Sequence, residues 1–262
     1  FQPETNSSFV TSGQDGKVLH FRLKAEEGGL ERKQFLGHGR EPVHIVRFST
    51  TGDSVASAGN GGKIFYYPVG SFQTNKDLKE AFEEGSENKE EEFLIVGSHL
   101  DAVRTLQFSN MLDGNKVSKE FLLSGGDDNQ INIWAVPEPE ASASSTTDKQ
   151  NLVRTFKGHS RPVEIVSFVI PEAGGNSVIP SSIYSLTRGV ESDLAEFFKW
   201  TIETPAPVED YRHDKQVIST AISPEGKSLV LGTTDGISMV ELEGLPPEVA
   251  LEFASNREEV SK

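Results

Sequence analysis

The feature of this sequence that most constrains its fold is a histidine that returns at a nearly constant interval, each time a few residues before an apolar, alternating segment. The intervals are 61, 60 and 54 residues, and the four positions are His38, His99, His159 and His213. The segments that follow them are residues 43–48, 103–108, 163–168 and 217–222. Because self-similarity at a fixed period is typical of repeat proteins, we expect one structural unit to be copied along the chain.

Each unit contains short segments with strand character, separated by turn residues. Residues 48–53 include Gly52 and Asp53 and lead from the first alternating segment into a second one at residues 55–58. A third segment follows a tight turn, as at Asp128-Asn129 before residues 131–134. Glycine, proline, asparagine and aspartate at such points are typical of hairpins. The order strand, hairpin, strand, hairpin, strand predicts an antiparallel meander and an all-β fold.

The unit resembles the WD40 repeat, in which a Gly-His pair opens the unit, a Trp-Asp pair closes it and a structural aspartate occupies the turn before the last strand. The best match runs from residues 98–101 (Ser-His-Leu-Asp) through residues 124–128 (Ser-Gly-Gly-Asp-Asp) to Trp134. The resemblance implies a WD40-type β-propeller of four-stranded antiparallel blades. About five repeats are recognisable, and we expect them to form part of a seven-bladed ring.

The resemblance also implies a domain layout. A single propeller domain over residues 1–262, or a fragment of one, carries repeats at approximately residues 9–23, 37–69, 97–136, 157–203 and 212–242. Residues 70–92 and 137–150 are polar or Pro, Ser and Thr rich, and we expect them to be inserted surface loops. Five repeats leave three explanations for ring closure open: a fragment, further divergent blades, or a blade completed by a partner.

In the resembling family each blade holds a buried hydrogen-bond relay of His, Ser, Asp and Trp, because a buried imidazole and a buried indole N–H need polar partners. Carried over, the third repeat supplies His99, Ser124, Asp128 and Trp134. The fourth repeat supplies His159, Ser185, Asp193 and Trp200. The second repeat keeps His38 and Ser57 but has Gly61 and Tyr67 at the Asp and Trp positions. The first repeat lacks the histidine and has Thr11, Asp15 and Phe21 at the other three positions. The fifth repeat has His213, Leu231, Asp235 and Glu241 at the four positions.

Composition narrows the function classes. The chain has 262 residues, a net charge of -15 and no cysteine. A disulfide scaffold and thiolate metal sites are thereby excluded. So strong an acidic balance argues against nucleic acid as a ligand, since phosphates are bound by Lys and Arg. No presequence and no apolar stretch of about 18 residues is found, so we expect an intracellular protein, cytoplasmic or nuclear, without a direct membrane contact.

Patterns typical of catalytic sites are weak in this chain. His20 and His44, which lie outside the repeated position, have no Asp or Glu at ligand spacing, so no metal site and no cofactor is expected. No Gly-x-Ser-x-Gly elbow accompanies the serines. The glycine-rich residues 57–62 lie between two predicted strands rather than before a helix, which favours a hairpin over a phosphate loop. These observations indicate a non-enzyme.

The resemblance places the His-bearing loops and the Asp-bearing turns on one rim of the ring, where contacts with proteins or peptides are expected. The candidate contact residues are Arg40, Glu41, Leu100, Asp101, Asp127, Arg161, Arg188, Glu191 and Asp214. Arg40 and Arg161 recur at nearly the same place, before Pro42 and Pro162, and an arginine there can anchor an acidic or peptide ligand. The alternative is that both are ordinary solvated loop residues. The acidic residues 87–92 are either a solvated loop or a docking strip for a basic partner.

The leading function hypothesis is a non-catalytic scaffold that mediates protein–protein interactions within an intracellular multi-subunit complex. An alternative of the same class is an acidic escort for basic clients such as histones or ribosomal proteins, for which salt-sensitive binding is expected. The rival from another class is a propeller enzyme or small-molecule binder, which requires a convergent polar pocket. Fold alone does not choose among them.

Overall fold

The computed structural model describes residues 1–3, 7–23, 29–69, 93–113, 116–136, 151–169, 182–187, 195–202, 206–207, 209–213, 217–222 and 228–241. Within these ranges every regular element is a β-strand. All strand pairs are antiparallel. The expected all-β antiparallel fold is therefore confirmed. Both predicted inserted loops, residues 70–92 and 137–150, lie outside the described residues.

The strands form five sheets, numbered here in chain order, and the strands within each sheet follow chain order as well. Sheet 1 contains β1 (Ser8–Ser12), β2 (Val18–Leu23) and β3 (Leu30–Phe35). Sheet 2 contains β4 (Val43–Phe48), β5 (Ser54–Gly59), β6 (Lys63–Pro68) and β7 (Leu94–Ser98). Sheet 3 contains β8 (Val103–Asp113), β9 (Lys116–Gly126), β10 (Gln130–Ala135) and β11 (Leu152–Lys157). Sheet 4 contains β12 (Val163–Val169), β13 (Ser182–Thr187), β14 (Ala195–Thr201) and β15 (Glu209–His213), and sheet 5 contains β16 (Val217–Ile222), β17 (Ser228–Thr233) and β18 (Gly236–Glu241).

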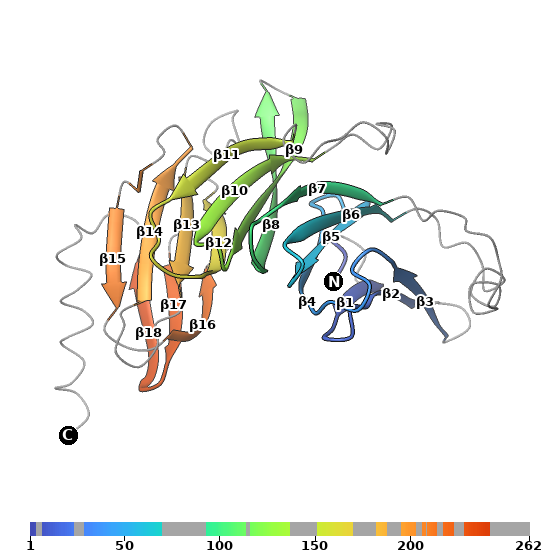
Figure 1. The fold of residues 1–262 in the computed structure, drawn as a ribbon, viewed down its shortest axis with the longest axis horizontal. Helices are drawn as coiled ribbons and strands as arrows, with labels where there is room; N and C mark the ends of the chain where they lie inside the picture. Colours follow the sequence, from blue (N-terminus) through green and yellow to red (C-terminus); the bar gives the residue numbers. More distant parts are fainter. Residues whose placement is uncertain are drawn as a thin grey trace.

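The five sheets follow one another along an arc, from sheet 1 in blue to sheet 5 in red (Figure 1). The first strands of neighbouring sheets pack together, with β4 against β8 and β8 against β12. Each sheet is formed by strands that are consecutive in the chain, and neighbouring sheets pack on one another at four junctions. This arrangement is propeller-like.

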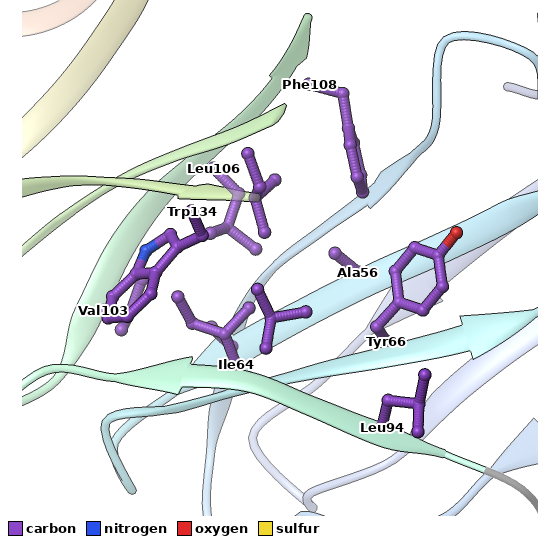
Figure 2. Close-up of a cluster of buried hydrophobic side chains, with 11 residues drawn as sticks. Ala56, Ile64, Tyr66, Leu94, Val103, Leu106, Phe108 and Trp134 are labelled. Carbon is purple, nitrogen blue, oxygen red and sulfur yellow. The ribbon is translucent and has the colours of Figure 1, made fainter. Parts of the chain in front are cut away.

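Apolar side chains fill the four junctions between neighbouring sheets, because the middle strands carry buried residues on both faces. At the junction of sheets 2 and 3, Ile64 and Tyr66 of β6 face Val103, Leu106 and Trp134 of sheet 3 (Figure 2). Three further clusters occupy the junctions of sheets 1 and 2, 3 and 4, and 4 and 5. Fully burying one such side chain stabilises the fold by about 1.5 to 3 kcal/mol.

The two sides of a sheet therefore have distinct neighbours. We call the side that packs on the preceding sheet the leading face, and the side that packs on the following sheet the trailing face. Trp134 lies on the leading face of sheet 3, and its indole ring covers Gly97 in β7 of sheet 2 so closely that a Cβ there would overlap the ring. Glycine at this position allows the two sheets to approach.

Candidate functional site

His99 is the centre of a buried polar network in sheet 3, and the structure brings together all four side chains that the resemblance implied. His99 Nδ1 lies 2.9 Å from Asp128 Oδ1, and His99 Nε2 lies 2.7 Å from Ser124 Oγ. Trp134 Nε1 donates to the same Ser124 Oγ at 2.7 Å. The backbone N–H groups of Leu100 and Gln130 also donate to Asp128, both at 3.1 Å.

The contacts assign a direction to every hydrogen bond in this network. A carboxylate only accepts, so Nδ1 of His99 carries a proton. The amide nitrogen of Asn132 only donates and lies 3.3 Å from His99 Nε2, so Nε2 is an acceptor. Ser124 donates its hydroxyl proton to Nε2, which leaves the Ser124 oxygen free to accept from the Trp134 indole. All members are satisfied, and the network ties the loop before β8 to the turn before β10.

Sheet 4 contains the same network with a different carboxylate. Trp200 Nε1 donates to Ser185 Oγ at 2.7 Å, and Ser185 Oγ lies 2.7 Å from His159 Nε2. The partner of His159 Nδ1 is Glu196 Oε2 at 3.1 Å, and Glu196 also accepts from the backbone N–H and the hydroxyl of Ser160. Glu196 was not among the predicted relay residues. Asp193, which the sequence suggested for this role, lies outside the described residues.

The other sheets keep only parts of the network. In sheet 2, His38 Nε2 lies 2.7 Å from Ser57 Oγ, and the Glu41 carboxylate lies against Gly61, where the turn has no aspartate. In sheet 1 a different buried pair, Ser8 and His20, is in hydrogen-bond contact.

The strand register corrects the expected position of the Trp equivalent in the fifth repeat. Trp134 pairs with Leu122, two residues before Ser124. The residue at the same place in sheet 5 is Val240, which pairs with Leu229, rather than Glu241. The turn between β17 and β18 is only two residues long, since Thr233 pairs with Gly236, and this shortening moves the register by one.

Burial and the carboxylates set the protonation of these groups. Desolvation lowers the pKa of His38 to about 4 and that of His20 also to about 4, the latter assisted by Lys33 and Arg22. Burial also lowers the pKa of His159, against the opposing effect of Glu196. Burial would raise the pKa of Asp128, but hydrogen bonds and the charge of His99 hold it below its usual value. Burial therefore favours the neutral form of His20, His38 and His159, while hydrogen bonds favour the ionised form of Asp128 and Glu196.

The His-bearing loops meet the turns that contain Gly16 in sheet 1 and Gly62 in sheet 2 at one edge of the sheets. A Cβ at Gly62, whose φ is 71°, would lie 2.7 Å from the carbonyl oxygen of His99, and His99 N donates to the carbonyl of Gly62 at 3.0 Å. Likewise Gly16, in the turn of sheet 1, packs on Arg40 in the loop of sheet 2. The turn of one sheet thus supports the His-bearing loop of the next. We call this edge the rim, formed by residues 13–17, 36–42, 59–62, 99–102, 126–130 and 158–162.

The candidate contact residues differ in how available they are on this rim. Arg40, Glu41 and Asp101 are exposed, and Leu100 is 90% exposed. Arg161 is half-buried. Asp127 is already engaged, because Arg104 Nε donates to its Oδ1 at 2.7 Å in a two-pronged ion pair. Arg188, Glu191 and Asp214 lie outside the described residues.

Sequence reasoning missed a row of polar residues beside the rim. The register of the first strand shifts at the same place in sheets 2, 3 and 4, which makes bulges at His44, Arg104 and Glu164. A bulge re-aims a side chain. Arg104 Nη1 lies 3.3 Å from His44 Nε2 of the neighbouring sheet. The hydrogen bond to Asp127 raises the pKa of Arg104, with contributions from Glu164 and Asp101, although burial opposes them.

The part of the chain that the structure describes contains no group of three or more His, Asp or Glu side chains that could hold a metal ion. In the same residues, no helix is long and apolar enough to cross a membrane.

This chain is similar to a known protein over a short stretch only. No family model matches the chain. A stretch of 72 residues is 32% identical to one of the subunits of chromatin assembly factor 1 of Saccharomyces cerevisiae, covering 24% of this chain. That stretch spans 15% of the length of the yeast protein. The matched portion is therefore a small part of both chains.

Proposed function

We propose that this protein is a non-catalytic WD40-type scaffold, and that it binds protein partners through the rim within a multi-subunit intracellular complex. The observation that carries this proposal is a group of exposed side chains on two loops, namely Arg40, Glu41, Leu100 and Asp101. Each loop is held to its sheet by a buried histidine, His38 through Ser57 and His99 through Ser124. Exposed side chains on a fixed backbone lose little freedom on binding, which lowers the entropic cost of recognition.

The chemistry of the described residues supports a binding role over a catalytic one. The buried histidines are hydrogen-bonded to Ser57, Ser124 and Ser185, and two of them also contact carboxylates. In sheets 3 and 4 the serine hydroxyl accepts from an indole N–H while it contacts the histidine, so its proton and its lone pair are both committed to the network. These groups stabilise the loops rather than face a substrate.

A second candidate function is an acidic escort for basic clients such as histones or ribosomal proteins. Two observations favour it: the net charge of -15, and the partial likeness to a protein whose name describes it as part of a chromatin assembly factor. Clustered negative charge speeds encounter with basic proteins and makes binding sensitive to salt. In this reading the acidic residues 87–92 contribute to the contact.

Charge reversal separates the two candidates. Partners captured by the tagged chain are compared for the wild type, for the double variant Arg40→Glu with Arg161→Glu, and for Glu90→Lys with Glu91→Lys as the matched control. Loss of capture in the first variant alone supports the rim scaffold. Loss in the second alone, together with binding of purified core histones that disappears at high salt, supports the escort, and loss in neither contradicts both.

A further inference from the structure

The turn between β5 and β6 contains the only Asn-Gly pair of the sequence, Asn60-Gly61. In such a pair the backbone nitrogen of the glycine can attack the side-chain carbonyl carbon of the asparagine and close a five-membered ring, because no Cβ shields the nitrogen. The turn lies on the rim, and Asn60 is exposed. Ammonia can therefore leave this site and water can enter it.

The hydrogen bonds of this turn do not involve the Gly61 nitrogen. Gly62 N donates to the carbonyl of Gly59 at 3.2 Å, and Asn60 N donates to the carbonyl of Pro42 at 3.0 Å. Within the described part of the chain, Gly61 N has no hydrogen-bond acceptor. A new bond to this nitrogen therefore breaks no hydrogen bond of the turn, so the attack does not carry that cost.

A carboxylate lies beside this nitrogen. Glu41 Oε2 is so close to Gly61 that a Cβ on the glycine would overlap it. Glu41 belongs to the loop that precedes β4, and its neighbour Pro42 accepts the hydrogen bond from Asn60 N, so the loop is held against the turn. A carboxylate next to a nucleophilic N–H can act as a general base.

A histidine contacts the carbonyl group that would be attacked. His44 Nε2 lies 2.5 Å from Asn60 Oδ1, and because an amide oxygen only accepts, Nε2 donates to it. The guanidinium of Arg104, whose Nη1 lies 3.3 Å from the same Nε2, adds positive charge nearby. A donor and a positive charge at this place stabilise the negative charge that develops on the oxygen during the attack.

We propose that Asn60 is a site of spontaneous deamidation in the folded protein, and that Glu41 and His44 promote the reaction. Gly61 N forms a bond to Asn60 Cγ, and its proton passes to Glu41. The bond between Cγ and Nδ2 then breaks, and the departing nitrogen takes the proton back from Glu41 and leaves as ammonia. One water molecule opens the cyclic imide at either of its carbonyls, which leaves aspartate or isoaspartate at position 60.

The product changes the rim in two ways. It adds a negative charge beside His44 and near Arg104, whose guanidinium is paired with Asp127. Isoaspartate also lengthens the backbone by a methylene group close to Gly62, which packs on the loop of His99. The reaction itself does not depend on whether the rim binds a partner.

Peptide mass spectrometry of the full chain, incubated at neutral pH, follows the loss of the amide at position 60. The folded wild type is expected to deamidate at Asn60 faster than the same chain unfolded in guanidinium chloride. Glu41→Gln and His44→Gln should each slow the reaction of the folded chain by at least about tenfold, because each removes a group that assists the attack. Neither variant should change the rate in the unfolded chain, where these groups are no longer held beside the turn.

Lys63→Gln is the matched control, since Lys63 is an exposed residue directly after the same turn, and it should deamidate at the wild-type rate. Circular dichroism melting verifies that each variant is folded.

Three results would overturn the proposal. An amide that persists in the folded chain while it is lost in the unfolded chain shows that the turn protects Asn60. Wild-type rates in both Glu41→Gln and His44→Gln exclude these groups as the source of any acceleration. Equal slowing in Lys63→Gln attributes the effect to a general change of the turn rather than to the two groups.

Discussion

Glu196 Oε2 lies 3.1 Å from His159 Nδ1, and it reaches the ring from within a strand rather than from the turn before it. Glu196 is the second residue of β14, whereas Asp128, which contacts His99 in sheet 3, lies in the turn that precedes β10. Glutamate has a longer side chain than aspartate, so Glu196 contacts His159 from a position inside the strand, whereas Asp128 contacts His99 from the preceding turn. The same polar connection between loop and sheet is thus made from two different backbone positions.

Removal of this carboxylate is expected to destabilise sheet 4. Glu196→Ala leaves the His159 Nδ1–H and the Ser160 N–H without an acceptor, and breaking a buried charge-assisted pair costs about 3 kcal/mol. The urea midpoint should fall with an unchanged dependence of the unfolding free energy on urea. Asp193→Ala is the matched control and should have little effect. A large loss in the control with none in Glu196→Ala would restore Asp193 as the relay residue.

The two adjacent aspartates of sheet 3 are expected to differ in the same assay. Asp128→Ala removes the acceptor of His99, Leu100 and Gln130 and should cost about 3 kcal/mol. Asp127→Ala breaks the partly exposed pair with Arg104, for which about 1 kcal/mol is expected. Equal losses would contradict the assignment of Asp128, and not Asp127, to the buried network.

Stability is expected to fall on mild acidification because of the buried histidines. The folded pKa of His38 and that of His20 are about 4, well below the ordinary value of 6.5. The unfolded chain therefore binds more protons between pH 6.5 and 4, so stability is full above this window and decreases through it, by up to about 1.4 kcal/mol per pH unit for each histidine. Below it, protonation of Asp128 and Glu196, whose pKa values are also lowered, adds to the loss.

Urea unfolding across that pH range provides the measurement. His38→Gln removes one titrating group, so the slope of unfolding free energy against pH between 6.5 and 4 should be shallower than for wild type, whatever the absolute stability of the variant. An identical slope in the variant would show that His38 is not the buried neutral group described above.

The sequence predicted the parts of this structure that depend on local spacing. Alternating segments and turn residues predicted an all-β antiparallel chain, because both signals are local. Glu196 could not be found in this way, since its contact with His159 depends on side-chain length and on a position inside a strand rather than in the preceding turn. Val240 was missed because the turn after β17 is one residue shorter than the spacing assumed.

The polar row His44, Arg104 and Glu164 was missed for a different reason. Each residue interrupts an apolar strand immediately after a buried valine, and a polar residue there looks like an ordinary solvent-facing position. Only the shift in register shows that these are bulges, and only the packing of β4 against β8 brings Arg104 near His44. Aligned comparison of the three strands offers the one sequence signal for this row.

The measurement that tests the central claim most directly is hydrogen–deuterium exchange of the chain alone and in complex with its captured partner. The rim account predicts slower exchange on binding in residues 36–42, 99–102, 126–130 and 158–162, with the outer strands β3, β7 and β11 unchanged. Protection confined to residues 87–92 or to those outer strands, with the rim exchanging as in the free chain, would contradict it.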